Sequence, residues 1–548
     1  MNERVKESVW MRWGVGGALC MAALLKAILL WAKVVPFNAD EAIVALMARH
    51  ILAGARPLFF YGQAYLGSLD AWLIAGGFAL FGQDVWVIRL VQILLYLGTM
   101  WTTAKLGEKI FSRKVGILVA WVLAIPVVNV TLYTTATLGG YGEALLLGNL
   151  TLLLAIKMKE TTRFIRGQWF LLGVLVGFGL WVFGLTLVFS APAGLFLLWH
   201  LITLRKVQKM NFEGSVRSKE PQILFRISTW LTPLFYAGGG FLLGALPYWA
   251  GAGQVGGGQV AAELGGSAIA GVEGVGWLAQ VGQHLVNLLL LGTSVIFGFR
   301  PPWEVRWLGL PLIPFMVMFW VWVLARTVRM KKTSGIWLLI GTMLTLGAGF
   351  VFTPFGADPS GRYFLPLVVP LALFAAAAVS GVKHPRGQVA LMAVLVGYAL
   401  IGTWQVAREN PPGITTQFDA VTWLDKSYDD ALIAFLQAHG ETRGYTNYWV
   451  AYPLAFLSGE DLVFIPALPY HLDFRYTARD DRYAPYDEVV AQAERVAFIT
   501  TNHPPLEARL RMGFGDLGVT WEEAQIGSYH VFYNLSRPVR PEEVDLSP

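Results

Sequence analysis

The segment from Gly14 to Ala42 reads GVGGALCMAALLKAILLWAKVVPFNADEA. Its apolar part carries no charge except Lys26 and Lys33, and it is long enough for a helix to cross the roughly 30 Å hydrocarbon core of a bilayer. The run ends at a proline, and the acidic pair Asp40 and Glu41 follows within a few residues. The stretch therefore predicts a membrane-spanning helix, kept as an uncleaved anchor, that delivers two carboxylates to the membrane surface.

The composition of the whole chain is that of a membrane protein. Of its 548 residues, 55% are hydrophobic and only 14% are charged, whereas about 25% are charged in a typical soluble domain. The net charge of +6 does not indicate nucleic-acid binding, because most Lys and Arg residues lie in short loops between apolar runs. The single cysteine, Cys20, excludes an intramolecular disulfide and a cysteine metal cage.

Basic loops predict the course of the chain through the membrane, because short loops rich in Lys and Arg stay in the cytoplasm. Such loops lie at about residues 4–12, 109–114, 157–166, 205–226, 326–332 and 383–386. Placing all of them inside gives a multi-pass protein of the cell (inner) membrane with a cytoplasmic amino terminus. The expected spans, about eleven, lie at about 14–35, 85–106, 115–133, 144–157, two short spans within 168–205, 229–249, 307–326, 336–353, 363–382 and 388–406.

Two further apolar segments are expected to lie at the membrane surface. Gly67–Gly82 is short and carries Asp70, whose carboxylate costs about 2.5–3.5 kcal/mol near the bilayer centre. A crossing at His284–Phe297 would invert the orientation of every later loop. We therefore expect an interfacial helix at the first segment and an interfacial or re-entrant segment at the second.

The composition changes after Arg408, so residues 1–407 are expected to form the membrane domain and 408–548 a soluble extracytoplasmic α/β domain. The aromatic segment Tyr445–Trp449 is typical of core packing, with sugar stacking as the alternative. Helical spacing and apolar runs predict helices at Ser427–His439 and Tyr486–Glu494, strands at Asp461–Pro466 and Arg495–Thr500, and a hairpin of Val519–Gln525 with Tyr529–Asn534.

The first outer loop, residues 36–84, carries a recognisable pattern. After the acidic pair comes an amphipathic stretch and then Gly54-Ala55-Arg56-Pro57-Leu58-Phe59-Phe60-Tyr61, with Gly-x-x-Pro-x-x-x-Tyr spacing. Val87-Ile88-Arg89-Leu90 and Gly361-Arg362-Tyr363-Phe364-Leu365-Pro366 continue the pattern. In these features residues 10–405 resemble the GT-C superfamily. The branch is the bacterial one related to dolichyl-phosphate-mannose–protein mannosyltransferases and the lipid A aminoarabinose transferase.

The resemblance implies a glycosyltransferase that moves a sugar from a polyprenyl-phosphate-linked donor to an acceptor outside the cytoplasm, whether protein, glycan or lipid. Such a transfer passes through an oxocarbenium-like state. The phosphate then leaves as an anion that needs cationic neighbours, and the incoming hydroxyl needs a base. Carboxylates could hold a divalent ion, but this branch generally uses none, so we expect no metal and no cofactor.

Two carboxylates of the first loop are the expected catalytic residues. Asp40 matches the catalytic aspartate of the family and is the predicted general base. Its alternative role is to cap the following helix, because aspartate is a preferred N-cap residue. Glu41 is predicted to assist catalysis or to bind a cation, with a solvated glutamate in the first helical turn as the alternative.

The expected substrate-binding residues lie on the same outer face. Arg362 is suited to bind the lipid phosphate in a bidentate way, with a headgroup-anchoring arginine as the alternative. Glu143 is the candidate for a second acidic residue that relatives carry in this loop, and a plain interfacial glutamate is its alternative. The remaining candidates are Tyr363 beside Arg362, Tyr61, Gln63 and Tyr65 in the sugar pocket, and Tyr141 in the second loop.

Two other classes of protein compete with the enzyme. A transporter or flippase of a lipid-linked or small solute should place ionisable or interrupted segments at mid-membrane. Here the spans contain little of this kind beyond Lys26 and Lys105. A non-catalytic membrane sensor would leave Asp40 and the long first loop without a purpose. The sequence therefore favours the enzyme, with a polyprenyl-phosphate sugar and membrane lipids as its partners.

Overall fold

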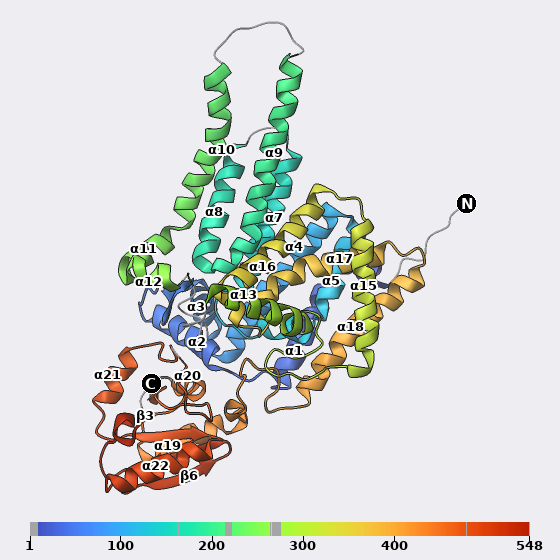
Figure 1. Cartoon of the computed structure of the whole chain (residues 1–548). Helices are drawn as coiled ribbons and strands as arrows, with labels where there is room; N and C mark the ends of the chain where they lie inside the picture. Colours follow the sequence, from blue (N-terminus) through green and yellow to red (C-terminus); the bar gives the residue numbers. More distant parts are fainter. Residues whose placement is uncertain are drawn as a thin grey trace.

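The structure is a computed structural model that describes residues 9–161, 165–213, 222–263, 265, 276–477 and 479–546. A body of helices is followed by a smaller domain with a sheet, which lies against one end of the body (Figure 1). The ends of α9 (Leu187–Glu213) and α10 (Gln222–Gly244) that flank the longest basic loop lie at the opposite end of the molecule (Figure 1). This arrangement fits a membrane between that loop and the small domain.

Eleven long apolar helices of the described residues overlap the predicted spans. They are α1 (Val9–Trp31), α4 (Val85–Ile110), α5 (Arg113–Ala124), α7 (Tyr141–Glu160), α8 (Arg166–Val182), α9, α10, α15 (Ile313–Arg329), α16 (Ser334–Phe352), α17 (Val368–Ser380) and α18 (Pro385–Ala407). The span predicted at about 115–133 is interrupted, because α5 ends at Ala124 and a separate helix, α6 (Val128–Tyr133), follows. Within the described residues, nine segments are long and apolar enough to cross a membrane, and all but Trp277–Ile296 are predicted spans. The prediction of a multi-pass helical membrane protein is confirmed.

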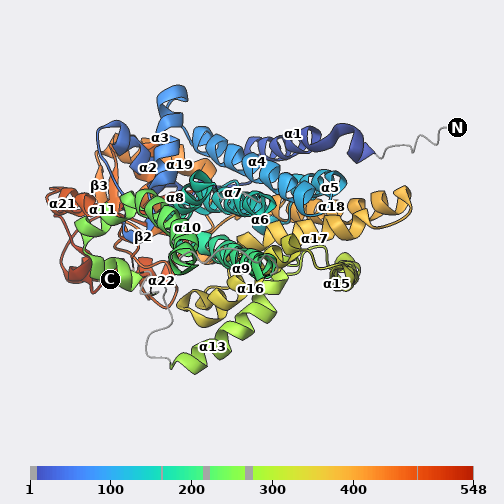
Figure 2. The same ribbon diagram turned by 90° about the horizontal axis from the view of Figure 1, so that it is seen from above.

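The apolar segment Trp277–Ile296 comprises α13 (Trp277–Val286), a π-helical turn (Asn287–Gly292) and α14 (Thr293–Ile296). Its length and composition permit a crossing. However, Figure 2 shows α15 nearly end-on while α13 extends across the view, and the two also run in different directions in Figure 1. A ring nitrogen of His284 bonds the carbonyl of Val351 on α16 at 3.0 Å. This course agrees with a segment that lies along the body rather than parallel to its spans.

Helix α3 (Leu69–Phe81) begins with a carboxylate that we expected at the water interface, and that expectation is wrong. Asp70 is 2% exposed. Its carboxylate accepts hydrogen bonds from Gln92 Nε2 at 2.8 Å and from the hydroxyl of Thr137, and it faces Glu143 of α7. A buried polar group is tolerated where protein hydrogen bonds replace water, so these partners offset the desolvation cost.

The C-terminal domain contains a mixed five-stranded sheet of order β4-β3-β5-β7-β6. The central strand β5 (Ala497–Thr501) is buried along its whole length, while β6 (Glu522–Ile526) is a charged edge, which protects the sheet from pairing with other chains. The other elements are β3 (Arg443–Tyr445), β4 (Val463–Ile465), β7 (Tyr529–Tyr533), α19 (Asp429–His439), α20 (Tyr448–Leu457), α21 (Pro485–Ala491) and α22 (Pro504–Asp516).

The strands, helices and hairpin predicted for this domain all occur in the structure. The sequence did not predict β3, α20 and α22.

The first outer loop lies between the helical body and the C-terminal domain. It forms α2 (Ala39–Leu52) and the small hairpin of β1 (Phe59–Phe60) and β2 (Gln63–Gly67), and α20 packs against α2 (Figure 1). The ring of Phe456 on α20 lies 5.6 Å from that of Phe37 and 4.6 Å from the guanidinium of Arg49. Residues of both domains therefore surround the start of α2.

Candidate functional site

Asp40 lies in the first turn of α2, where the two domains meet. The N-cap of this helix is Asn38, whose side-chain oxygen accepts a hydrogen bond from the Glu41 amide at 3.0 Å. The alternative that Asp40 caps the helix is therefore wrong. The Asp40 side chain is partly exposed, and its Oδ1 accepts a 2.6 Å hydrogen bond from the hydroxyl of Tyr448 on α20. A residue of the C-terminal domain thus orients this carboxylate.

Glu41 lies on a different face of α2 and is completely buried. Its carboxylate accepts hydrogen bonds from Arg89 Nη2 at 2.5 Å and from the Thr137 amide at 3.3 Å, and Arg89 also donates to the carbonyl of Pro36. Burial raises the pKa of Glu41 to about 7, although Arg89 lowers it. The alternative of a solvated glutamate is wrong, and the residue forms a buried ion pair that joins α2 to α4.

Arg362 begins a 3₁₀ turn (Arg362–Leu367) ahead of α17, and one third of its side chain is exposed. Its Nε and Nη2 both lie 2.6 Å from Oδ2 of Asp358. The guanidinium also lies 5.1 Å from the ring centre of the buried Tyr363. Asp358 therefore takes the Nε–Nη2 edge of the guanidinium, and a phosphate would bind through Nη1.

Tyr65 connects the two sides of the site. It lies on β2, and burial raises the pKa of its hydroxyl. The charged groups that act on this hydroxyl are Arg362 from the helical body, Asp40, and Arg479 and Arg482 from the C-terminal domain. The structure thus places the predicted base and the predicted phosphate-binding arginine around one tyrosine, although they are far apart in the sequence.

The other predicted substrate-binding residues divide between this cluster and its surroundings. Tyr141 is buried near Arg362, with its ring 4.9 Å from that of Phe183. Tyr61 instead stacks on Tyr483 at 4.7 Å and hydrogen-bonds His50 at 3.0 Å, so it packs in the domain interface.

Glu143 lies inside the helical body, and its role as a second acidic residue of the site stays a prediction. It is 2% exposed and faces Asp70, so the alternative of an interfacial glutamate is wrong. Two buried carboxyl groups that face each other are stable in the fold only where one holds a proton or both are well hydrogen-bonded.

The sequence did not identify Arg482 and Asp480, which lie in the loop that follows β4. Arg482 lies 5.7 Å from the ring centre of Tyr448 and donates to the side-chain oxygen of Gln63 from Nη1 at 2.7 Å and Nη2 at 3.1 Å. Burial raises the pKa of Asp480 to about 7. The charge of Asp40 also raises this pKa, whereas the charge of Arg482 lowers it. The only sequence signal nearby was the aromatic segment Tyr445–Trp449, which supplies Tyr448.

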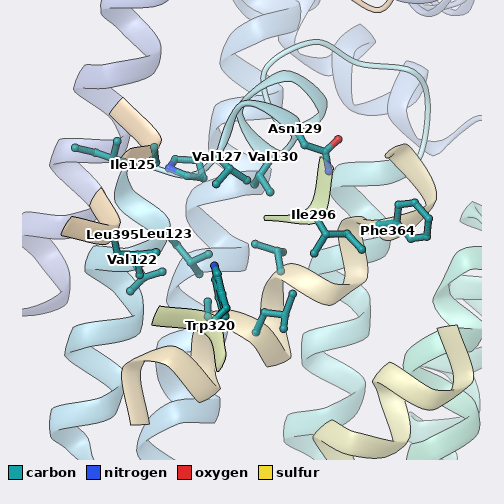
Figure 3. Close-up of a pocket in the computed structure, with 15 residues that line it drawn as sticks. Val122, Leu123, Ile125, Val127, Asn129, Val130, Ile296, Trp320, Phe364 and Leu395 are labelled. Carbon is teal, nitrogen blue, oxygen red and sulfur yellow. The ribbon is translucent and has the colours of Figure 1, made fainter. Parts of the chain in front are cut away.

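An apolar hollow opens in the helical body beside the 3₁₀ turn of Arg362 (Figure 3). Its wall includes Phe364, which is two residues from Arg362, and its polar end is Asn129, which donates to the carbonyl of Gly361 at 3.3 Å. It is lined by Val122, Leu123, Ile125, Pro126, Val127, Asn129, Val130, Ile296, Trp320, Phe364, Val368, Leu371, Ala372, Leu395 and Ala399.

Comparison with known proteins places this architecture in a class. Residues 68–213 match the family model described as dolichyl-phosphate-mannose-protein mannosyltransferase. The structure is similar to that of ArnT from Cupriavidus metallidurans in the apo state, with a TM-score of 0.57 and 13% identity over 95% of this chain and 98% of that one. The same protein bound to undecaprenyl phosphate matches with a TM-score of 0.53 and 12% identity, over the same shares. No curated protein sequence matches the chain.

These matches define the class of the fold. The chain has the GT-C fold, a polytopic fold of membrane glycosyltransferases, and the resemblance predicted from the sequence is confirmed. The family match is carried by residues 68–213, and the similarity to ArnT extends over nearly the whole chain as a similarity of fold.

Proposed function

We propose that the chain transfers a sugar from a polyprenyl-phosphate-linked donor to a hydroxyl acceptor on the outer face of the cell membrane, with Asp40 as the general base. The observation that carries the proposal is the position of Asp40. Its carboxylate is partly exposed, held by Tyr448, and lies in the same cluster as Arg362 and Arg482. A base beside cations is what a transfer from a phosphate leaving group requires.

The chemistry assigns one step to each group. The bond between the sugar C1 and the phosphate oxygen breaks, and the acceptor oxygen bonds to C1. The acceptor proton passes to Asp40, and the phosphate leaves with the electron pair. Arg362 is proposed to stabilise that anion through Nη1, because Asp358 already occupies its other edge.

The surroundings of the site support a lipid-linked donor. The structure of ArnT with undecaprenyl phosphate shows that this fold accommodates a polyprenyl phosphate. In the present chain the apolar hollow beside Phe364 adjoins the turn of Arg362 (Figure 3). We propose that part of the isoprenoid chain occupies this hollow. No observation favours the transporter alternative, and the expected independence of metals stays a prediction.

The test is donor-lipid profiling. Membranes that contain the protein and matched membranes with Asp40→Asn would be compared for the loss of each polyprenyl-phosphate sugar and for the polyprenyl phosphate released. We expect one donor to be consumed in the first sample alone. If no donor is consumed in the presence of the wild-type protein, the proposed reaction is contradicted.

The proposed orientation has its own test. In a Cys20→Ala background, cysteines introduced at the exposed positions Ser112 and Asp473 would be treated with a membrane-impermeant maleimide from outside the cell. Labelling at position 473 and protection at position 112 are expected. The reverse result would show that the topology is inverted and that the site does not lie on the outer face.

A further inference from the structure

Arg482 differs from the other arginines of the site in its partners. Within the described part of the chain, Arg362 forms an ion pair with Asp358 at 2.6 Å and Arg479 with Glu263 at 3.3 Å. Arg482 forms no ion pair within 4 Å of any described carboxylate, and its guanidinium contacts the Gln63 oxygen and the ring of Tyr448. Of these three arginines, Arg482 is therefore the one without a direct carboxylate partner among the described residues.

The surroundings of Arg482 hold its side chain in place. Gly62, at φ +70°, brings the turn between β1 and β2 so close that a Cβ there would lie 2.9 Å from Cδ of Arg482. The Arg482 amide donates to the Tyr452 hydroxyl at 2.6 Å. Its Nε is buried and has no hydrogen-bond partner among the described residues. Arginines in such positions are normally paired, so this guanidinium is arranged to receive an anion.

The position of Arg482 points to the anion in question. Its charge acts on Asp40, the predicted base, and on Tyr448 and Tyr65. We infer that Arg482 binds the phosphate of the lipid-linked donor, so that the C-terminal domain completes the active site. This inference rests on the proposed function and adds a phosphate-binding residue from the other domain.

A guanidinium is suited to bind a phosphate in both charge and geometry. The planar donor set of arginine binds phosphate oxygens in a bidentate way, and the charge-assisted bonds are about twice as strong as neutral ones. Arg362 comes from the helical body and Arg482 from the C-terminal domain, so the leaving phosphate would meet a cation from each domain. The proton of the acceptor goes to Asp40, and the negative charge that develops on the phosphate is stabilised by Arg482.

Binding of undecaprenyl phosphate tests this inference on the full-length protein in nanodiscs. The dissociation constant would be measured for the wild type, Arg482→Gln, Arg482→Lys and Arg475→Gln. Arg475 is the matched control, because its side chain is 68% exposed and pairs with Asp473 in the same loop region. We expect Arg482→Gln to bind about 10- to 100-fold more weakly, since charged hydrogen bonds are at stake. Arg482→Lys should fall between, and the control should match the wild type.

Two further ligands distinguish binding of the lipid-linked phosphate from binding of the lipid alone and from binding of free phosphate. Undecaprenol, which lacks the phosphate, should bind the wild type and Arg482→Gln equally, and inorganic phosphate should bind far more weakly than the lipid. Equal binding of undecaprenyl phosphate to Arg482→Gln and the wild type would overturn the inference. Combined with donor consumption that still depends on Asp40, that result would leave the proposed function intact. A wild type that does not distinguish undecaprenyl phosphate from undecaprenol would contradict both.

A measurement on the wild type covers the case in which the variants do not fold. Phenylglyoxal modifies accessible arginines, and mass spectrometry of peptides locates the modified residue. Undecaprenyl phosphate should protect Arg482 and leave Arg475 reactive, while undecaprenol should protect neither. Modification of Arg482 at the same rate with and without undecaprenyl phosphate would overturn the inference in the same way.

Discussion

Two acidic regions of the molecule lie close together in the sequence and have opposite environments. Around Asp40, at the domain interface, the carboxylate is partly exposed and bonded by Tyr448. Around Glu41, inside the helical body, the carboxylate is buried and paired with Arg89, and the Asp70–Glu143 pair is buried in the same body. Successive residues of a helix point about 100° apart, so one step along α2 separates the site from the core.

Acidity alone therefore does not identify a catalytic residue here. A group that must take a proton from a substrate needs a face open to that substrate. A carboxylate that is completely buried among protein groups instead fixes the position of its helix. Variants of these residues separate the two roles.

The largest effect is expected for Asp40→Asn. Asparagine keeps the shape of the side chain and can still accept a hydrogen bond from Tyr448, but it cannot take a proton. Turnover of the lipid-linked donor should fall by a factor of about 10²–10⁴, the usual contribution of general-base catalysis. Thermal stability in detergent should stay near that of the wild type. A loss of turnover below about tenfold in a well-folded protein would return Asp40 to a structural role.

The next effect is expected on stability, for Glu41→Gln. The change leaves the buried guanidinium of Arg89 without an anion, and breaking a buried ion pair in this way costs about 3–5 kcal/mol. We expect a large drop in thermal stability, while turnover per folded molecule stays within about tenfold of the wild type. The reverse pattern, normal stability with a severe loss of turnover, would make Glu41 a catalytic residue after all.

The same variant has a pH signature. The pKa of Glu41 is raised to about 7 in the fold, whereas an exposed glutamate titrates near 4.3. Between about pH 4.3 and 7 the folded protein therefore binds more protons than the unfolded chain, and this group's contribution to stability falls as the pH rises. Denaturation at several pH values should show this slope in the wild type and not in Glu41→Gln.

A smaller effect is expected for Tyr448→Phe, which removes the hydrogen bond that orients Asp40. A hydrogen bond to a charged group is worth about 1.5–3 kcal/mol, so kcat should fall about tenfold or more while KM changes little. Trp449→Phe, one residue along α20, is the control. An unchanged kcat in Tyr448→Phe would show that Tyr448 acts only in packing.

The sequence predicted much of the architecture because the membrane imposes strong patterns. Long apolar runs and basic loops located the spans, and alternating apolar residues located the strands and the hairpin. The short strand Arg443–Tyr445 has too few residues for a pattern. Gly67–Gly82 was placed correctly as a helix, but the burial of Asp70 depends on Gln92 and Thr137, whose proximity follows only from helix packing.

The candidate site residues named from the sequence all lie before the C-terminal domain, and their roles stay predictions. In the structure, the charges of Asp40 and Arg362 both act on the hydroxyl of Tyr65. Tyr448, Asp480 and Arg482 come from a domain that follows the spans, and no local spacing links residue 40 to residue 448 or 482. Contacts of this separation are fixed by how the two domains pack, which periodicity does not encode.

The smallest effect is expected for Asp480→Asn. This variant tests the part of the candidate site that the C-terminal domain contributes. Because burial raises the pKa of Asp480 to about 7, its carboxyl is mostly neutral below that pH and mostly ionised above it. Once ionised, it adds a second negative charge beside Asp40 and competes with the donor phosphate for Arg482. The wild type should therefore lose activity, measured as kcat/KM, by a few-fold up to about tenfold between pH 7 and 9. In Asp480→Asn this alkaline loss should disappear, while activity at pH 6.5 stays near the wild-type value. Asp473→Asn, an exposed carboxylate of the same loop region, is the control. The same alkaline loss in Asp480→Asn and in the wild type would show that Asp480 does not act on the site.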